Sequence, residues 1–174
     1  HLMRRVDQEL QALGQGRAYF VSEDRSFRNP ADWGTLIGMV NADYADMVGR
    51  VEHDPAGAAE LLFTRLDAAS KAAGAEARLS KLDAATRSAL AERLDAEAKD
   101  WLKSKRADYP DTLEGRTLVI EFSRGGPTGT PMPLPAPYGY RHSLSLLSPE
   151  ILSQASVLYI WVTPEESRRK NEER

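Results

Sequence analysis

The chain contains no cysteine and only three histidines among its 174 residues. Without cysteine there is no disulfide framework and no thiolate ligand for a metal. His1, His53 and His142 are not spaced as metal ligands are, so we predict no metal site. The lack of disulfides and of a secretory signal peptide is typical of cytoplasmic proteins, and we expect a cytoplasmic location.

Long apolar runs and an excess of positive charge are absent as well. No run approaches the ~20 residues that a membrane helix needs. The formal net charge is -3, with 26 acidic and 23 basic residues, which does not favour binding to nucleic acid or to an anionic membrane. We therefore expect no nucleic acid and no membrane among the partners. The nucleophile elbow Gly-x-Ser-x-Gly and the Gly-Lys-Ser/Thr ending of a phosphate-binding loop are also missing.

Three segments have the composition of β-strands. The strongest is Arg116–Arg124, in which Leu118, Val119 and Ile120 form a continuous apolar run. The others are Ala18–Ser22 and Val157–Thr163. Continuous apolar runs of this length are typical of strands that are covered on both faces. The sequence therefore predicts strands that lie in the interior of a sheet.

Helical periodicity and helix start signals occupy the segments between these strands. A long alanine-rich block is broken near Gly74 and restarts near Asp83. Ser148-Pro149-Glu150 caps a short helix, and Pro164-Glu165-Glu166 starts the last one, with acidic residues placed well for the helix dipole. The predicted helices lie at Arg4–Leu13, 30–52, Ala56–Lys105 (two or three helices), 148–155 and from Pro164 onward.

The alternation of helices and strands predicts an α/β fold with a mostly parallel sheet flanked by helices. Residues 4–53 and 107–174 would form the α/β core, and residues 54–106 a helical insertion or subdomain. The insertion either covers a substrate or partner, or is a structural helical layer.

Polar residues follow two of the predicted strands at their carboxyl ends. Glu121 ends one strand and Asp24 follows another, and such ends meet at one edge of a parallel sheet. We predict these two carboxylates as catalytic, with Glu121 acting as a base or ordering the Mg²⁺ shell. The alternatives are a strand-end ion pair for Glu121 and a solvated turn for Asp24.

Arginines and aromatic residues complete the predicted site. Arg124, Arg168 and Arg169 are predicted to bind phosphate groups. For the last helix the alternative is a solvated surface with pairs such as Glu165–Arg169. The predicted substrate-binding residues, which would contact the acceptor or stack on a base or sugar, are Arg25, Tyr138, Tyr140 and Arg141. The aromatic residues could equally pin the preceding loop to the domain.

Three of these stretches together resemble the P-loop kinase superfamily, in particular small-molecule kinases of the nucleoside, nucleotide and adenylylsulfate type. Tyr19-Phe20-Val21-Ser22-Glu23-Asp24 is similar to their second strand, and Leu118-Val119-Ile120-Glu121-Phe122 to their Walker B region. Leu158-Tyr159-Ile160-Trp161-Val162-Thr163-Pro164-Glu165-Glu166 is similar to the strand that leads into their arginine-bearing lid helix. The resemblance implies phosphoryl transfer from ATP, with Mg²⁺, to a small-molecule substrate.

The chain departs from the family pattern because it has no Walker A segment and no last strand. We expect either a truncated or late-started kinase or a rearranged relative that does not bind nucleotide in this way. ATP and Mg²⁺ are expected for an intact protein only, and this chain alone is expected to bind no cofactor and to be inactive.

The alternative function is a non-enzymatic α/β interaction module. In that case the alanine-rich helices bind a partner, and Pro131–Pro137 docks it as an extended polyproline-like segment. An exposed sheet edge or an incomplete core would favour self-association, so we expect a homo-oligomer.

Overall fold

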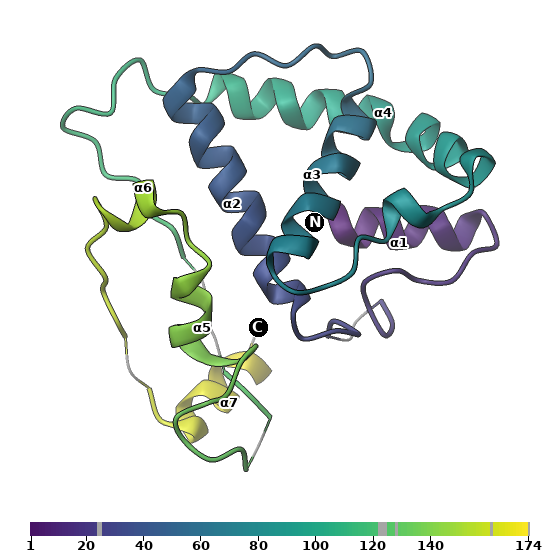
Figure 1. The fold of residues 1–174 in the computed structure, drawn as a ribbon. Coiled ribbons are helices and arrows are strands. Elements are labelled where there is room, and N and C mark those ends of the chain that lie inside the picture. Colours follow the sequence, from purple (N-terminus) through teal and green to yellow (C-terminus); the bar gives the residue numbers. More distant parts are fainter. Residues whose placement is uncertain (24–25, 122–124, 128, 161, 174) are drawn as a thin grey trace.

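The computed structural model describes residues 1–23, 26–121, 125–127, 129–160 and 162–173, with the backbone alone at 164, 168, 171 and 172. Helices and connecting loops make up the fold (Figure 1). The helices are α1 (Leu2–Ala12), α2 (Asp32–Gly49), α3 (Ala58–Ala72), the 3₁₀ turn η1 (Leu79–Lys81), α4 (Ala84–Ala107), α5 (Gly139–Ser145), α6 (Pro149–Leu152) and α7 (Pro164–Glu172).

Helices α1 to α4 pack together around the main hydrophobic core. α3 lies against both α2 and α4, and α1 lies against α4. The buried side chains recur every three or four residues, which places them on one face of each helix. They include Val6 and Leu10 of α1, Leu62, Phe63 and Leu66 of α3, and Leu90, Leu94 and Ala98 of α4. The helices of segment 54–106 thus share one core with α1.

Two glycines let α2 approach α3 closely. A Cβ atom built on Gly34 would lie 2.7 Å from the Cβ of Ala73, and one built on Gly38 would lie 2.6 Å from the Cβ of Ala69. Both distances are shorter than carbon atoms tolerate. Small residues on both helices are therefore what allows this packing.

Several helix starts agree with the sequence prediction. Asp83 accepts a hydrogen bond from the backbone N–H of Thr86 at the start of α4. Ser148 accepts from Ile151 at the start of α6, and Thr163 accepts from Glu166 at the start of α7. These caps satisfy backbone donors that the first helical turn leaves free. The predictions of helix starts at Asp83, Ser148 and Pro164 are confirmed.

A smaller cluster joins α5 and α6 to the outer face of α2. Ile37 of α2 packs there with Leu147 and Ile151. Asn41 reinforces the contact, because its side-chain amide donates to the Leu146 carbonyl over 2.8 Å and its oxygen accepts from the Ser148 N–H over 3.0 Å. The C-terminal part of the chain is thereby attached to the four-helix body.

The predicted α/β fold with a parallel sheet is wrong. Among the described residues the only β-pairing is an isolated antiparallel bridge between Phe20 and Phe27. Among the described residues the predicted strand at Ala18–Ser22 pairs through this bridge alone, and the backbone N–H groups of Ala18, Tyr19 and Phe20 bond to the carboxylate of Asp7 on α1. The P-loop NTPase-like, kinase-like architecture implied by the resemblance is therefore wrong as well. The described residues form a helical fold.

The described residues of the other two predicted strands lie outside any helix or sheet. Residues 116–121 run between α4 and the proline-rich loop, and residues 155–160 run between α6 and α7 (Figure 1). In the described part of the chain, none of the helices combines the length and the apolar character that crossing a membrane requires.

Candidate functional site

The predicted catalytic residues are not brought together in the described structure. Asp24, Arg25 and Arg124 lie outside the described residues. Glu121 is exposed in an irregular segment that directly follows the half-buried Ile120. No second catalytic group is placed beside Glu121 by the described structure.

The predicted phosphate-binding residues of α7 have local partners or are not described. Arg168 belongs to α7, but its side chain lies outside the described atoms. Arg169 is exposed and pairs with Glu166 over 2.6 Å and with Glu173 over 2.6 Å, both on its own helix. The Arg169 guanidinium in turn holds the pKa of the Glu166 carboxyl below its usual value. These contacts are those of a solvated helix, although Glu166 rather than Glu165 makes the pair with Arg169.

The predicted substrate-binding aromatics lie at α5. Tyr138 is half-buried and occupies the residue before the helix, whereas Arg141 is exposed on its first turn. Tyr140 packs edge-on against Tyr159, with ring centroids 5.3 Å apart. Tyr140 thus ties α5 to the segment that precedes α7.

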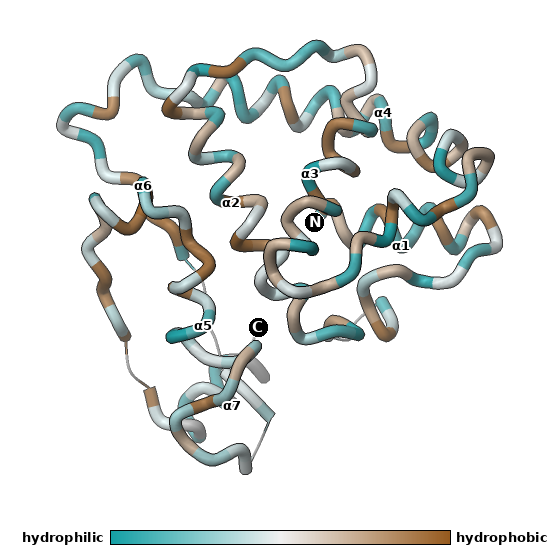
Figure 2. Tube along the Cα trace, viewed as in Figure 1, coloured by the Kyte–Doolittle hydropathy of each residue, from teal (hydrophilic) through white to brown (hydrophobic). Residues whose placement is uncertain are grey.

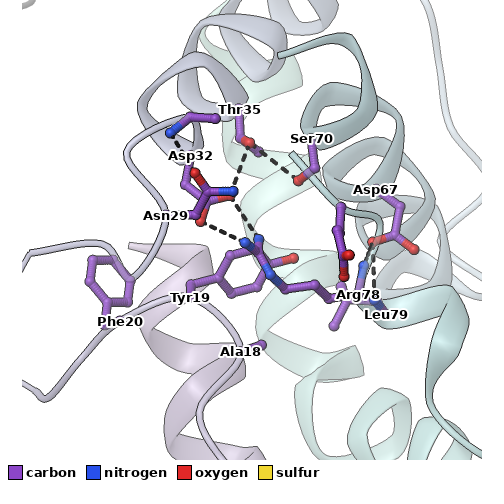
Figure 3. Close-up of polar contacts among 12 residues, drawn as sticks. Ala18, Tyr19, Phe20, Asn29, Asp32, Thr35, Asp67, Ser70, Arg78 and Leu79 are labelled. Atoms are coloured by element: carbon purple, nitrogen blue, oxygen red, sulfur yellow. Dashed lines mark hydrogen bonds and ion pairs between the residues drawn. The ribbon is translucent and has the colours of Figure 1, made fainter. Parts of the chain in front are cut away.

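A buried polar cluster contains Asp7, Asp32 and Asp67 together with Arg78. Figure 3 shows Asp32, Asp67 and Arg78 of this cluster. Arg78 makes two parallel hydrogen bonds to the carboxylate of Asp32, of 2.7 and 2.9 Å. Beside this pair, the Thr35 hydroxyl donates to Ser70 over 3.2 Å. The Arg78 guanidinium also lies over the ring of Tyr19, 5.0 Å from its centroid.

The two other aspartates bind backbone N–H groups. Asp67 accepts from Arg78, Leu79 and Ser80 over 2.9, 3.0 and 2.6 Å, and so fixes the turn between α3 and α4. Asp7 fixes the loop before α2 in the same way. Because each carboxylate is buried and already holds several donors, we interpret the cluster as structural and not catalytic.

A second charged cluster joins the end of α2 to α3. His53 lies 2.8 Å from Asp46, and Arg65 lies 2.5 Å from the same carboxylate oxygen. A hollow of about 330 Å³ beside them is lined by Asp46, His53, Lys103, Arg106 and Tyr109, among others. Within the lining Asp46 pairs with His53 and Glu52 with Arg106, while Lys99 and Lys105 pair with Asp95 and Asp43 outside it. Most charges around the hollow are therefore already paired, and we do not assign it a charged ligand.

An apolar groove lies between two of the three segments that were predicted as strands, residues 116–121 and residues 155–160. It has a volume of about 420 Å³ and lies over α5. The residues that line this apolar groove are Ile120, Tyr140, Leu144, Leu147, Ser156, Val157, Leu158 and Tyr159. No charged side chain contributes to this lining.

The segment on one side of the groove exposes large apolar side chains. Val157, Leu158, Tyr159 and Ile160 are 69, 85, 58 and 74% exposed. Figure 2 shows this apolar stretch on the outer side of the molecule, between α6 and α7. Leu118 and Val119, next to Ile120, are 53 and 78% exposed. A contiguous apolar surface of this kind is typical of an interaction site.

The backbone of this segment is unpaired. Within the part of the chain that the structure describes, the N–H and C=O groups of residues 157–160 make no hydrogen bond to another backbone group. The same holds for residues 117–121. Such a row of free donors and acceptors is what a sheet edge offers to an incoming strand.

The sequence prediction placed these apolar residues in the interior and therefore missed the groove. One signal was present: residues 151–164 contain no charged side chain, in a chain of which 28% is charged. Of the predicted site residues that the structure describes, Tyr140 alone lines the groove. Glu121 follows Ile120 at its margin.

In the described residues, no group of three or more His, Cys, Asp or Glu side chains is arranged to hold a metal ion. Comparison with known proteins found no matching family model, no matching curated protein and no matching solved structure.

Proposed function

We propose that the protein is a non-enzymatic interaction module that binds an extended, apolar segment of a partner polypeptide at the apolar groove. The observation that carries the proposal is the exposed segment Val157–Ile160, whose side chains are apolar and whose backbone makes no hydrogen bond to another backbone group among the described residues. An added strand would pair with this backbone and place alternate side chains in the groove.

The other surfaces that the sequence suggested are less suited to a partner. The apolar faces of α3 and α4 are buried in the main core, so they are not free to bind. In the proline-rich loop, Leu134 packs close to Gly126 and Gly139, while Met132 is 79% exposed. One exposed methionine offers much less apolar area than the groove and its flanking segment.

The predicted phosphoryl transfer stays a prediction. Its catalytic carboxylates are not assembled by the described residues, and the groove has no charged group that would bind a phosphate. Strand addition needs neither, because main-chain hydrogen bonds and apolar contacts supply the affinity.

Peptide binding tests the proposal. A fluorescently labelled peptide of alternating valine and threonine is titrated with the protein, and its anisotropy is measured. We expect saturable binding, and at least about tenfold weaker binding of a peptide with a central proline, because proline removes a ladder donor.

Two matched variants locate the binding surface. Leu158→Asp adds a charge beside the groove at a position that is 85% exposed, and Val48→Asp adds one on α2 at a position that is 51% exposed. The first is expected to abolish peptide binding and the second to leave it unchanged. Equal binding by wild type and Leu158→Asp, or equal binding of the proline peptide, would refute the proposal.

A further inference from the structure

We infer that the segment 156–160 pairs in an antiparallel manner with the same segment of a second copy of this chain. The inference rests on the proposed function and names the occupant of the free edge. A twofold axis would then cross the middle of the segment, so that each copy supplies the same residues to the interface.

The first argument is the absence of the devices that keep edges apart. Soluble proteins protect exposed edges with charged side chains, proline or bulges. Here residues 151–164 carry no charge, and the first proline after Pro149 is Pro164, where α7 begins. The exposed apolar residues Val157 to Ile160 fall inside this uncharged stretch. Nothing in the segment would repel an identical segment.

The second argument is that a single contact would satisfy both the backbone and the side chains. The backbone groups of residues 157–160 are unpaired in the described structure, and an identical antiparallel strand offers donors and acceptors in the matching order. Leu158 and Ile160 point to one side of such a strand, and Val157 and Tyr159 to the other. One side would therefore meet the groove and the other would add apolar area to the new interface.

The third argument favours the antiparallel direction. Glu165 and Glu166 stand in the first turn of α7, directly after the segment. In a parallel pair the two acidic turns would lie side by side. In an antiparallel pair they lie at opposite ends, separated by at least the five residues of the segment at ~3.3 Å each, or about 17 Å, which exceeds the screening length of about 8 Å at physiological salt.

Sedimentation across a wide range of protein concentration tests the pairing. The wild type is expected to convert from monomer to dimer as its concentration rises. Leu158→Lys and Ile160→Pro are expected to stay monomeric with unchanged helical circular dichroism, whereas Val48→Lys is expected to dimerise like the wild type. A wild type that stays monomeric, a dimer that persists in both segment variants, or assemblies without a defined size would each overturn the inference.

Cysteine cross-linking tests the direction, because the chain contains no cysteine and gives no background. Leu158→Cys lies on the proposed axis and is expected to form a disulfide with its own counterpart. Ser156→Cys lies away from the axis and is expected to stay reduced under the same oxidation. Equal cross-linking at both positions, or at neither, would overturn antiparallel pairing.

The peptide titration separates failure of this inference from failure of the proposed function. A monomer that still binds the alternating peptide contradicts the second copy as occupant and leaves the interaction module standing. A monomer that does not bind the peptide contradicts both.

Discussion

Arg78 and Asp32 form a two-pronged ion pair in the interior, with hydrogen bonds of 2.7 and 2.9 Å and no exposed surface on Asp32. The pair joins the turn after α3 to the first residue of α2. Two charges at such a position are tolerated because they satisfy each other.

Replacing Arg78 is expected to destabilise the fold strongly. Arg78→Met removes one charge and leaves the Asp32 carboxylate buried without its partner, which costs about 3–5 kcal/mol in comparable cases. Urea denaturation followed by circular dichroism measures this loss as a lower midpoint.

Lys81→Met is the matched control. Lys81 pairs with Glu76 over 3.1 Å, and both side chains are exposed, at 63 and 73%. Exposed pairs contribute at most about 1 kcal/mol, so this variant should unfold nearly like the wild type. A loss in Arg78→Met no larger than in Lys81→Met would show that the buried pair is not important for stability.

Asp7 is predicted to be a second point of high sensitivity. Its carboxylate accepts from the N–H groups of Ala18, Tyr19 and Phe20 over 2.7, 3.0 and 2.8 Å. Asp7→Asn replaces one acceptor oxygen by an NH₂ donor and removes the charge, so we expect a loss of at least about 2 kcal/mol.

Hydrogen exchange gives this prediction a local readout. The amides of Tyr19 and Phe20 should exchange faster in Asp7→Asn, because their acceptor is weakened. Asp54→Asn is the control, since Asp54 accepts a 2.8 Å hydrogen bond from Ala56 in an exposed turn. Unchanged exchange at Tyr19 would contradict the role given to Asp7.

The sequence was sufficient to predict features that are decided locally. The helix starts predicted at Asp83, Ser148 and Pro164 depend on side chains close to the start, and the structure contains all three. The alanine-rich block forms α3 and α4 with the predicted break, where Gly74 adopts a φ of 77°. The start of α2 was predicted two residues early, since Asn29 accepts from Ala31 in the turn before the helix.

The strands could not be predicted correctly because a strand requires a partner that lies elsewhere in the chain. Tyr19 and Phe20 have strand-like side chains, yet a carboxylate on α1 takes their N–H groups. Val157 to Ile160 have the composition of a buried strand, yet they are 58–85% exposed. The same composition fits an interior strand and an open edge, and only the fold decides between them.

Gly38 tests the close packing of α2 on α3. Gly38→Ala would place a Cβ 2.6 Å from the Cβ and 3.0 Å from the Cα of Ala69, so the helices must move apart. Overpacking of this kind costs about 1–3 kcal/mol, which exceeds the gain of up to about 1 kcal/mol from the better helix propensity of alanine.

A double variant identifies the contact that causes the loss. Gly38→Ala combined with Ala69→Gly removes the clashing methyl group, so its loss should be smaller than the sum of the two single losses. Thermal denaturation of the three variants supplies the comparison. Additive losses would mean that Gly38 acts through something other than Ala69.

Tyr19 gives the protein a predicted sensitivity to alkaline pH. Burial raises the pKa of its phenol above the ordinary value, and the nearby Asp67 charge adds to the shift. Above pH ~10 the unfolded chain loses this proton while the folded chain keeps it, so the free energy of unfolding falls as the pH rises further. Below pH ~10 the phenol is neutral in both states and this loss is absent.

Tyr19→Phe removes the titrating group, so its free energy of unfolding should fall less between pH about 8 and about 11 than that of the wild type. At neutral pH the variant should unfold within about 1 kcal/mol of the wild type, because the buried Tyr19 hydroxyl has no hydrogen-bond partner among the described residues. Tyr159→Phe is the control, since the Tyr159 side chain is 58% exposed and lies outside the main core. Denaturant titrations at both pH values measure the difference, and an alkaline loss that is as large in Tyr19→Phe as in the wild type would assign the sensitivity to other groups.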